Sequence, residues 1–177
     1  PILRKNIYLY QKNVKKDFND TKKILIIGGS QGAKFFDESI TKVILKISKE
    51  LNVEVCQQVF NKNKKILIEQ QYNKYEIKHR LFNFDENLFE KLNNYDLAIT
   101  RAGASAISEL SQLCIPFIAI PFPFAKDNHQ FYNAKNYLDK DLCWMIRQED
   151  FEVKKVSFLL KNLLNNKEEY FSKKNNI

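Results

Sequence analysis

Short apolar runs alternate with longer segments of helical periodicity along most of this chain. The runs are rich in Ile, Val, Leu and Phe, which favour strands, and they cover residues 23–27, 53–59, 77–84, 97–100, 117–120 and 143–146. Helices are expected between and after them, over residues 36–47, 66–72 and 88–92 and from about residues 104, 128 and 151. The alternation predicts an α/β fold, a parallel sheet of about six strands with helices on both faces.

The length of 177 residues and a hydrophobic content of 44% allow one sizeable core. No apolar run reaches the roughly 18–20 residues that a membrane-spanning helix needs, and we expect no secretory signal. The cysteines Cys56, Cys114 and Cys143 are odd in number, far apart and set in apolar runs. We therefore expect buried, reduced cysteines that form neither a disulfide framework nor a zinc site. No metal and no cofactor are expected elsewhere in the chain either.

The formal net charge of +8 comes mostly from scattered Lys residues accompanied by many Asn residues. This pattern is typical of a solvated surface. A second interpretation is peripheral contact with an anionic membrane, to which each Lys near the surface adds about 1 kcal/mol. No stripe interleaves Arg with aromatic residues, so a nucleic-acid partner is not expected.

The glycines of the chain all come directly after predicted strands: Gly28, Gly29, Gly32 and Gly103. In parallel α/β sheets, ligands bind at these carboxyl ends of the strands. The turn over Gly28–Ala33 aims backbone N–H groups and a helix N-terminus at one point, which suits an anion such as a diphosphate. A tight turn without a ligand explains the same glycines, and the spacing is neither a dinucleotide fingerprint nor a P-loop.

A second strand-to-helix turn covers Thr100–Ser105. Glu109 follows Ser105 by four residues, so both side chains lie on one helix face. A carboxylate at this position can accept both hydroxyls of a ribose. The alternative for Glu109 is a solvated residue that interacts with the helix dipole.

A third polar segment, Pro121–Ala134, follows another predicted strand. Its proline-paced loop leads into a helix whose first turns carry His129, Gln130 and Asn133. Side chains that both donate and accept hydrogen bonds suit the hydroxyls of a sugar. A lone His at this position would more often be a capping or surface residue, but the three polar groups together favour a site.

Together these segments resemble the C-terminal domain of the MurG family, peptidoglycan N-acetylglucosaminyltransferases of two facing Rossmann-like domains (the GT-B architecture). Gly28–Ala33 is similar to the family's GGSQGA turn, and Arg101–Ala104 is similar to its RAGA turn. Pro121–Ala134 is similar to its P-F-P-x-A-x-D-N-H-Q-x-x-N-A stretch. The resemblance spans roughly residues 24–147.

The resemblance implies a binding site for UDP-N-acetylglucosamine. The first glycine turn would hold the diphosphate and donor sugar, and the backbone at Phe84 would meet the uracil. Amides at the start of the second helix would join the site, Glu109 would bind the ribose, and His129 and Gln130 would contact the sugar hydroxyls. The implied residues are Arg4, Gly29, Ser30, Gln31, Gly32, Phe84, Gly103, Ala104, Ser105, Glu109, His129 and Gln130.

The implied reaction is inverting transfer of N-acetylglucosamine to a lipid-linked muramoyl-pentapeptide, at the cytoplasmic face of a bacterial inner membrane. In the family, the base and the acceptor groove belong to an N-terminal domain, so we expect no catalytic residue in this chain. We expect a junction segment over residues 1–22, the UDP-sugar domain over 23–166 and a fraying tail over 167–177. Because the chain starts with Pro1 and its single methionine is Met145, we interpret it as a piece of a longer polypeptide.

Two departures from the family pattern leave other functions open. Residues Gln57–Phe60 replace an H-Q-[ST]-G stretch, and Cys114 stands where glycine is usual. A donor subunit of another glycolipid glycosyltransferase is one alternative. A non-catalytic nucleotide-sugar sensor or relic is another, and a basic nucleic-acid-binding domain is a third.

Overall fold

The computed structural model describes residues 20–29, 34–85, 88 and 95–176. Six strands form a single sheet in the order β3-β2-β1-β4-β5-β6, and each neighbouring pair is parallel. The strands are β1 (Lys22–Ile27), β2 (Val53–Gln58), β3 (Lys78–Phe82), β4 (Leu97–Thr100), β5 (Phe117–Ala119) and β6 (Trp144–Met145). The predicted fold class, a six-stranded parallel Rossmann-like sheet, is confirmed.

The central strand β1 is buried on both faces. Ile24 pairs with Val55 of β2 on one side and with Leu97 of β4 on the other. Ile24 and Ile26 belong to one apolar core, and Leu25 between them belongs to the core on the opposite face. This two-sided burial explains why β1 reads as a continuous apolar run rather than as an alternating one.

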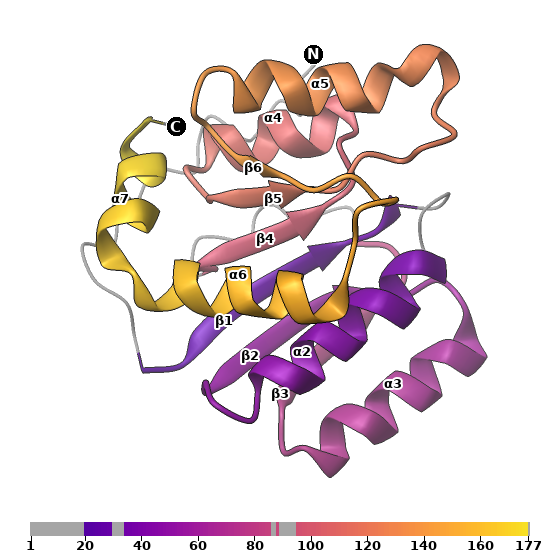
Figure 1. The fold of residues 1–177 in the computed structure, drawn as a ribbon. Helices are drawn as coiled ribbons and strands as arrows, with labels where there is room; N and C mark the ends of the chain where they lie inside the picture. The colour runs from indigo at the N-terminus through magenta and orange to yellow at the C-terminus, as the bar shows by residue number, and fades with distance from the viewer. Residues whose placement is uncertain (1–19, 30–33, 86–87, 89–94, 177) are drawn as a thin grey trace.

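Helices cover both faces of the sheet (Figure 1). One core contains side chains of α2, α3 and α6, and the other contains side chains of α4 and α5. The helices are η2 (Phe36–Ile40), α2 (Thr41–Ile47), α3 (Lys62–Lys74), α4 (Ala104–Gln112), η4 (Lys126–Asn128), α5 (His129–Leu138), α6 (Val153–Asn165) and α7 (Lys167–Asn176). None of the helices in the described residues is long and apolar enough to cross a membrane.

Local sequence sets where these helices begin. The helix expected over residues 66–72 spans Lys62–Lys74 because the Asn61 side chain caps it, accepting a hydrogen bond from the backbone N–H of Lys64 at 3.1 Å. The helix expected over residues 36–47 begins with a π-helical turn, η2, before α2. Of the helix expected over residues 88–92, only Leu88 lies within the described residues.

The C-terminal residues expected to fray instead form α7. Tyr170 of α7 is only 1% exposed, and its hydroxyl donates a hydrogen bond to the backbone carbonyl of Asp96 at 2.6 Å. Asp96 directly precedes β4, so α7 packs near the amino end of this strand. The burial of the Tyr170 ring and the hydrogen bond of its hydroxyl explain why this segment is a helix rather than a frayed tail. They anchor α7, although its composition is mostly polar.

The three cysteines are free and buried, as expected. Cys114 has a φ of 52°, in the left-handed region that favours glycine. This backbone conformation is the physical reason why a glycine suits position 114, directly after α4.

Candidate functional site

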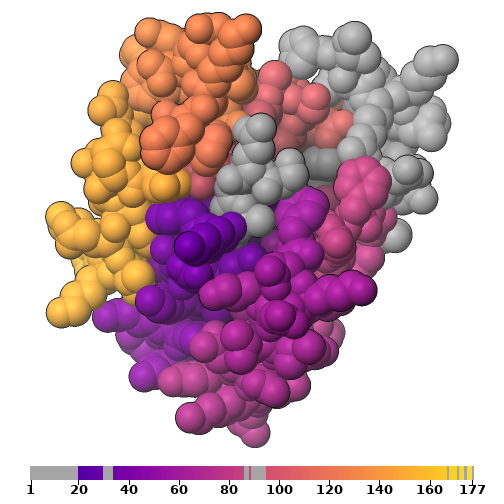
Figure 2. Space-filling model, turned by 90° about the vertical axis from the view of Figure 1, so that its right-hand side faces the viewer, coloured from indigo at the N-terminus to yellow at the C-terminus, as the bar shows by residue number. Residues whose placement is uncertain are grey.

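A cavity of about 340 Å³ opens at the side of the sheet where the strands have their carboxyl ends. Figure 2 faces this side, with the orange α5 region above and the magenta β2–α3 region below. Four of the residues predicted from sequence line the cavity, namely Gly29, Phe84, Ser105 and Glu109. The remaining lining residues are Ile27, Gln58, Phe60, Phe82, Asp85, Leu88 and Ala106.

Glu109 is buried in the wall of this cavity. Its side chain is 1% exposed, and it lies one turn after Ser105 on α4, as the four-residue spacing predicted. The alternative interpretation of Glu109 as a solvated helix residue is wrong. A buried carboxylate is an acceptor of several hydrogen bonds, so this wall of the cavity can receive a ligand that carries hydroxyl groups.

Gly29 requires its glycine. Its φ is 61°, and its N–H group donates to Oε1 of Gln58 at 3.1 Å. Nε2 of Gln58 donates in turn to the carbonyl of Asn83 at 3.1 Å. Gln58 therefore ties together the segments that follow β1 and β3, and it holds the start of the glycine turn.

Sequence reasoning missed Gln58 as a site residue. It treated Gln57–Phe60 as a loss of a family glycine that left the approach of this loop in doubt. The structure shows an ordered hydrogen-bonded contact between this loop and Gly29 instead. The signal was a buried amide at the end of a strand, where a polar side chain needs partners.

The start of α4 offers backbone amides to the same region. Gly103 is the N-cap of α4, with an ordinary φ of −65°, and a Cβ at this position would meet nothing within 4 Å. Gly103 has no side chain with which to cap the helix, so the first-turn amides are left for solvent or a ligand. Ala104 and Gly103 adjoin the cavity in sequence but do not line it.

The third predicted segment has an unusual backbone. Asp127 and Asn128 are consecutive left-handed residues, each with a φ of 51°. Asp and Asn tolerate this conformation better than most residues. This kink directly precedes α5, which begins at His129, close to the helix start expected near Asn128.

His129 and Gln130 lie on the same side of the sheet but do not line the cavity of Glu109. Nδ1 of His129 is 2.8 Å from the carbonyl of Lys126, and Oε1 of Gln130 accepts a hydrogen bond from the N–H of Phe122 at 3.0 Å. The Asn133 amide donates to the carbonyl of Ala102 at 3.1 Å. Asn133 therefore fastens α5 to the loop that follows β4.

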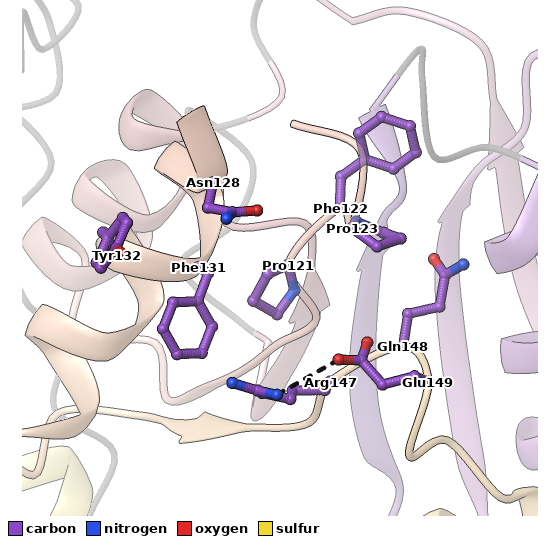
Figure 3. A pocket seen from close by; sticks show the side chains of 9 residues that line it. All are labelled: Pro121, Phe122, Pro123, Asn128, Phe131, Tyr132, Arg147, Gln148 and Glu149. Atoms are coloured by element: carbon purple, nitrogen blue, oxygen red, sulfur yellow. Dashed lines mark ion pairs between the residues drawn. The ribbon is translucent and has the colours of Figure 1, made fainter. Parts of the chain in front are cut away.

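A second cavity, of about 380 Å³, lies between the start of α5 and the loops after β5 and β6 (Figure 3). Phe131 projects into it, and Arg147 lies across its base, 4.8 Å from the Phe131 ring centroid and 3.5 Å from Glu149. This cavity was not predicted from sequence. It is lined by Pro121, Phe122, Pro123, Asn128, Phe131, Tyr132, Arg147, Gln148 and Glu149.

Arg101 follows β4, and its side chain reaches the loops that follow β5 and β6. It is only 5% exposed. Nη1 donates to the carbonyls of Ile120 and Pro121 at 3.2 and 3.0 Å, and Nη2 donates to Oε1 of Gln148 at 2.6 Å. Burial lowers the pKa of the guanidinium to about 10. Its central carbon lies 5.3, 4.9 and 5.4 Å from three ring centroids, those of Phe35, Phe36 and Phe122.

Some predicted site residues lie outside the described residues: Arg4, Ser30, Gln31 and Gly32. Within the described ranges, no group of three or more His, Cys, Asp or Glu side chains could hold a metal ion. The other histidine, His79, has its Nδ1 atom 2.8 Å from the carbonyl of Ile77. It does not line either cavity.

A family model for the glycosyltransferase family 28 C-terminal domain matches residues 23–177. The chain belongs to this family. It is 41% identical over 183 residues to a UDP-N-acetylglucosamine–N-acetylmuramyl-(pentapeptide) pyrophosphoryl-undecaprenol N-acetylglucosamine transferase of Pelagibacter ubique, covering 99% of the chain and 49% of that protein. A transferase of the same name from Rickettsia bellii is 38% identical over 170 residues, covering 93% of the chain and 48% of that protein.

Solved structures confirm the fold. A crystal structure of Acinetobacter baumannii MurG matches with a TM-score of 0.80 at 22% identity, covering 96% of this chain and 50% of that one. The lipopolysaccharide glycosyltransferase WaaG matches with a TM-score of 0.68 at 15% identity, over 99% of this chain and 49% of that one. This chain thus spans about half the length of the relatives it matches.

Proposed function

We propose that this chain is the donor-binding half of a glycosyltransferase and that its ligand is UDP-N-acetylglucosamine. The cavity of Glu109 would take the nucleoside. Glu109 would accept the ribose hydroxyls, and Phe84, which is 67% exposed at the rim, would meet the uracil through its backbone. Gly29 and the first-turn amides of α4 would face the diphosphate, because helix N-termini attract anions.

The observation that carries this proposal is the meeting of Gly29, Phe84, Ser105 and Glu109 in one cavity. They come from segments that follow three different strands, β1, β3 and β4, so their convergence is a property of the fold. The names of the relatives from Pelagibacter ubique and Rickettsia bellii support UDP-N-acetylglucosamine as the sugar nucleotide.

We propose that the whole enzyme transfers N-acetylglucosamine with inversion to a lipid-linked muramoyl-pentapeptide, converting lipid I to lipid II in peptidoglycan synthesis. An acceptor hydroxyl would attack the anomeric carbon, its proton would pass to a general base, and UDP would leave. The amides at the start of α4 would stabilise the departing diphosphate. We propose that the base and the acceptor groove lie outside this chain, as the resemblance to the two-domain family implies, and neither His79 nor His129 lines the cavity of Glu109.

The same proposal places the protein in the cytoplasm, peripherally on the inner membrane. The net charge of +8 supports contact with anionic lipid, and no nucleic-acid partner is proposed. We propose residues 1–22 as a junction segment and a donor domain that starts at residue 23. The packing of α7 supports an end of this domain beyond residue 166, the limit proposed from sequence.

Ligand-dependent thermal unfolding tests the proposal. The purified chain is heated with UDP-N-acetylglucosamine, UDP-glucose, UDP and, as a control for dinucleotide binding, NADH. A ligand at a hundred times its dissociation constant stabilises the folded state by about 2.7 kcal/mol. We expect stabilisation by the uridine ligands, largest for UDP-N-acetylglucosamine, and none by NADH.

Glu109→Ala should abolish the shift with all uridine ligands, because it removes the acceptor proposed for the ribose. Glu69→Gln is the matched control, since Glu69 is an exposed residue of α3 that does not line the cavity. No shift of the unchanged chain at millimolar ligand would contradict donor binding. An equal shift in the Glu109→Ala protein would place the nucleotide elsewhere.

A further inference from the structure

Arg101 lies at the joint between two segments of the proposed donor site. It follows β4 directly and precedes α4, whose N-cap is Gly103 and which carries Ser105 and Glu109. Its guanidinium points the other way, to the loops after β5 and β6, where it donates to the Pro121 carbonyl and to Gln148. Arg101 therefore connects α4, which forms part of the cavity of Glu109, with the loop that leads into α5.

The surroundings of the guanidinium suit arginine rather than any other cation. Arg101 forms no ion pair with a described carboxylate, and its charge is met by carbonyl and amide oxygens and by three phenylalanine rings. A planar fork can donate in several fixed directions while its faces stack on rings. A lysine ammonium keeps the charge but lacks both the fork and the flat faces.

The contacts of Arg101 extend to Gln130 through a single residue. Arg101 donates to the carbonyl of Pro121 at 3.0 Å, and the N–H of the next residue, Phe122, donates to Oε1 of Gln130 at 3.0 Å. The ring of Phe122 also lies over the guanidinium, at 5.4 Å. Losing the fork would release the Phe122 backbone, and with it the orientation of the Gln130 amide.

The segment between β4 and the first turn of α4, next to the proposed nucleoside site, is held by hydrogen bonds that do not involve the guanidinium. The backbone N–H of Arg101 donates to the carbonyl of Ile27 at 3.1 Å, and the Ala102 carbonyl accepts from Asn133 at 3.1 Å. The first turn of α4 is closed by the hydrogen bond from Ile107 N to the Gly103 carbonyl at 3.2 Å. These bonds survive a change of the Arg101 side chain.

We propose that Arg101 is a positioning residue that holds Gln130 in place on the same side of the sheet as the cavity of Glu109 and so sets the preference for a UDP-sugar over UDP. This inference rests on the proposed function. It predicts a selective defect: a change of the Arg101 side chain lowers affinity for the sugar nucleotide and leaves affinity for the bare nucleotide.

Calorimetric titration of the chain with UDP and with UDP-N-acetylglucosamine tests it. In Arg101→Lys we expect the dissociation constant for UDP to stay within about twofold of the unchanged chain. The preference for the sugar nucleotide, given by the dissociation constant for UDP divided by that for UDP-N-acetylglucosamine, should fall by about fivefold. This is the effect of one misplaced hydrogen bond. Arg147→Lys is the matched control, because Arg147 is a neighbouring arginine that contacts Phe131 and Glu149 rather than the Pro121–Gln130 connection.

Thermal unfolding of each variant without ligand first establishes that it is folded. If Arg101→Lys does not fold, Gln148→Leu takes its place, since it removes one acceptor of the guanidinium and leaves the charge. It should lower the same ratio by about twofold, the lower range for one hydrogen bond.

The outcomes separate this inference from the proposed function. If the unchanged chain binds no uridine ligand, the proposed function fails and the inference fails with it. If the unchanged chain binds UDP and the sugar nucleotide equally, or if the folded Arg101→Lys or its replacement Gln148→Leu keeps the full preference, the inference alone is overturned. An equal loss of both affinities also overturns it, because Arg101 would then support the whole site without selecting the sugar.

Discussion

At the scale of single residues, glycine is favoured at positions 29 and 103 for two different reasons. Gly29 has a φ of 61° and needs glycine for its backbone. Gly103 has an ordinary φ, and a Cβ there would meet nothing within 4 Å. The free chain therefore gives no steric reason for glycine at 103, whereas a diphosphate approaching the start of α4 would.

We predict that Gly103→Ala changes the free energy of unfolding by less than about 0.5 kcal/mol, because the lost chain entropy of glycine offsets the weaker N-cap. Its affinity for UDP-N-acetylglucosamine should fall about tenfold, since the new methyl group occupies the approach of the diphosphate. Urea unfolding and calorimetric titration measure the two quantities. Gly29→Ala is the contrast, with an expected stability loss of about 1 kcal/mol. Unchanged affinity in Gly103→Ala would show that no ligand comes close to this backbone.

Cys114 gives the opposite prediction, a gain in stability. Its left-handed φ of 52° costs a residue with a Cβ about 1 kcal/mol relative to glycine. Cys114→Gly should therefore raise the free energy of urea unfolding by up to about 1 kcal/mol. Cys143→Ala should lower it by about 1 kcal/mol, because Cys143 is fully buried in the apolar core next to α5. A loss in both variants would mean that the Cys114 side chain contributes more by packing than its backbone costs.

At the scale of secondary-structure elements, the π-helical turn η2 carries a buried acid. Asp37 is 5% exposed, and no hydrogen-bond partner for its Oδ1 atom lies among the described residues. Burial raises the pKa of this carboxyl from 3.8 to about 6, against the opposing effect of Lys64. The folded state therefore holds this proton more tightly than the unfolded state does.

The sign of the resulting pH dependence follows from linkage. The contribution of Asp37 to stability is fully present below about pH 3.8 and is lost as the pH rises through about 6. The loss at neutral pH is up to about 3 kcal/mol. We predict that Asp37→Asn is more stable than the unchanged chain at pH 7.5 and about equal to it near pH 4, by urea unfolding.

Glu38→Gln is the control for this prediction. Hydrogen bonding to Lys64 lowers the pKa of the half-buried Glu38 carboxyl, so its contribution is present at neutral pH and is lost on acidification. Its removal should change the pH profile in the opposite direction. Parallel profiles for the unchanged chain and Asp37→Asn between pH 4 and 8 would contradict a raised pKa for Asp37.

The helix α7 depends on Tyr170. We predict that Tyr170→Phe lowers the free energy of unfolding by about 1–2 kcal/mol, because it leaves the carbonyl of Asp96 without the hydroxyl that donates to it. Donor affinity should not change, since Asp96 lies at the amino end of β4 and the proposed site lies at the other end. A loss of affinity together with stability would instead couple α7 to the site.

Sequence reasoning predicted the elements whose signals are local. The apolar runs gave all six strands, and the spacing of Ser105 and Glu109 gave one wall of the cavity. It did not find the roles of Gln58 and Arg101, because the partners that define these roles come from distant segments of the chain. It missed α7 for the same reason: the polar segment is a helix because Tyr170 reaches Asp96.

At the scale of the whole molecule, the chain spans about half the length of the relatives it matches. We predict that the purified chain binds UDP-N-acetylglucosamine but does not transfer the sugar to a lipid-linked muramoyl-pentapeptide. The physical reason is that the proposed base and acceptor groove are not part of the cavity of Glu109. A radiolabelled-sugar transfer assay measures this, with the full-length Pelagibacter ubique relative as the positive control. Turnover by the chain alone would place a general base within it.

The strand order bears on how the chain is made. During translation β1, β2 and β3 leave the ribosome before β4 and can pair with one another, but the other side of β1 pairs with β4, which begins only at Leu97. Until that segment emerges, the apolar strand β1 presents an open hydrogen-bonding edge. Parallel pairings between distant segments also form slowly. We therefore expect the nascent chain to be vulnerable to aggregation, and to be bound by chaperones, while this edge of β1 is unpaired. That stage ends only when β4 pairs with β1 in the middle of the sheet.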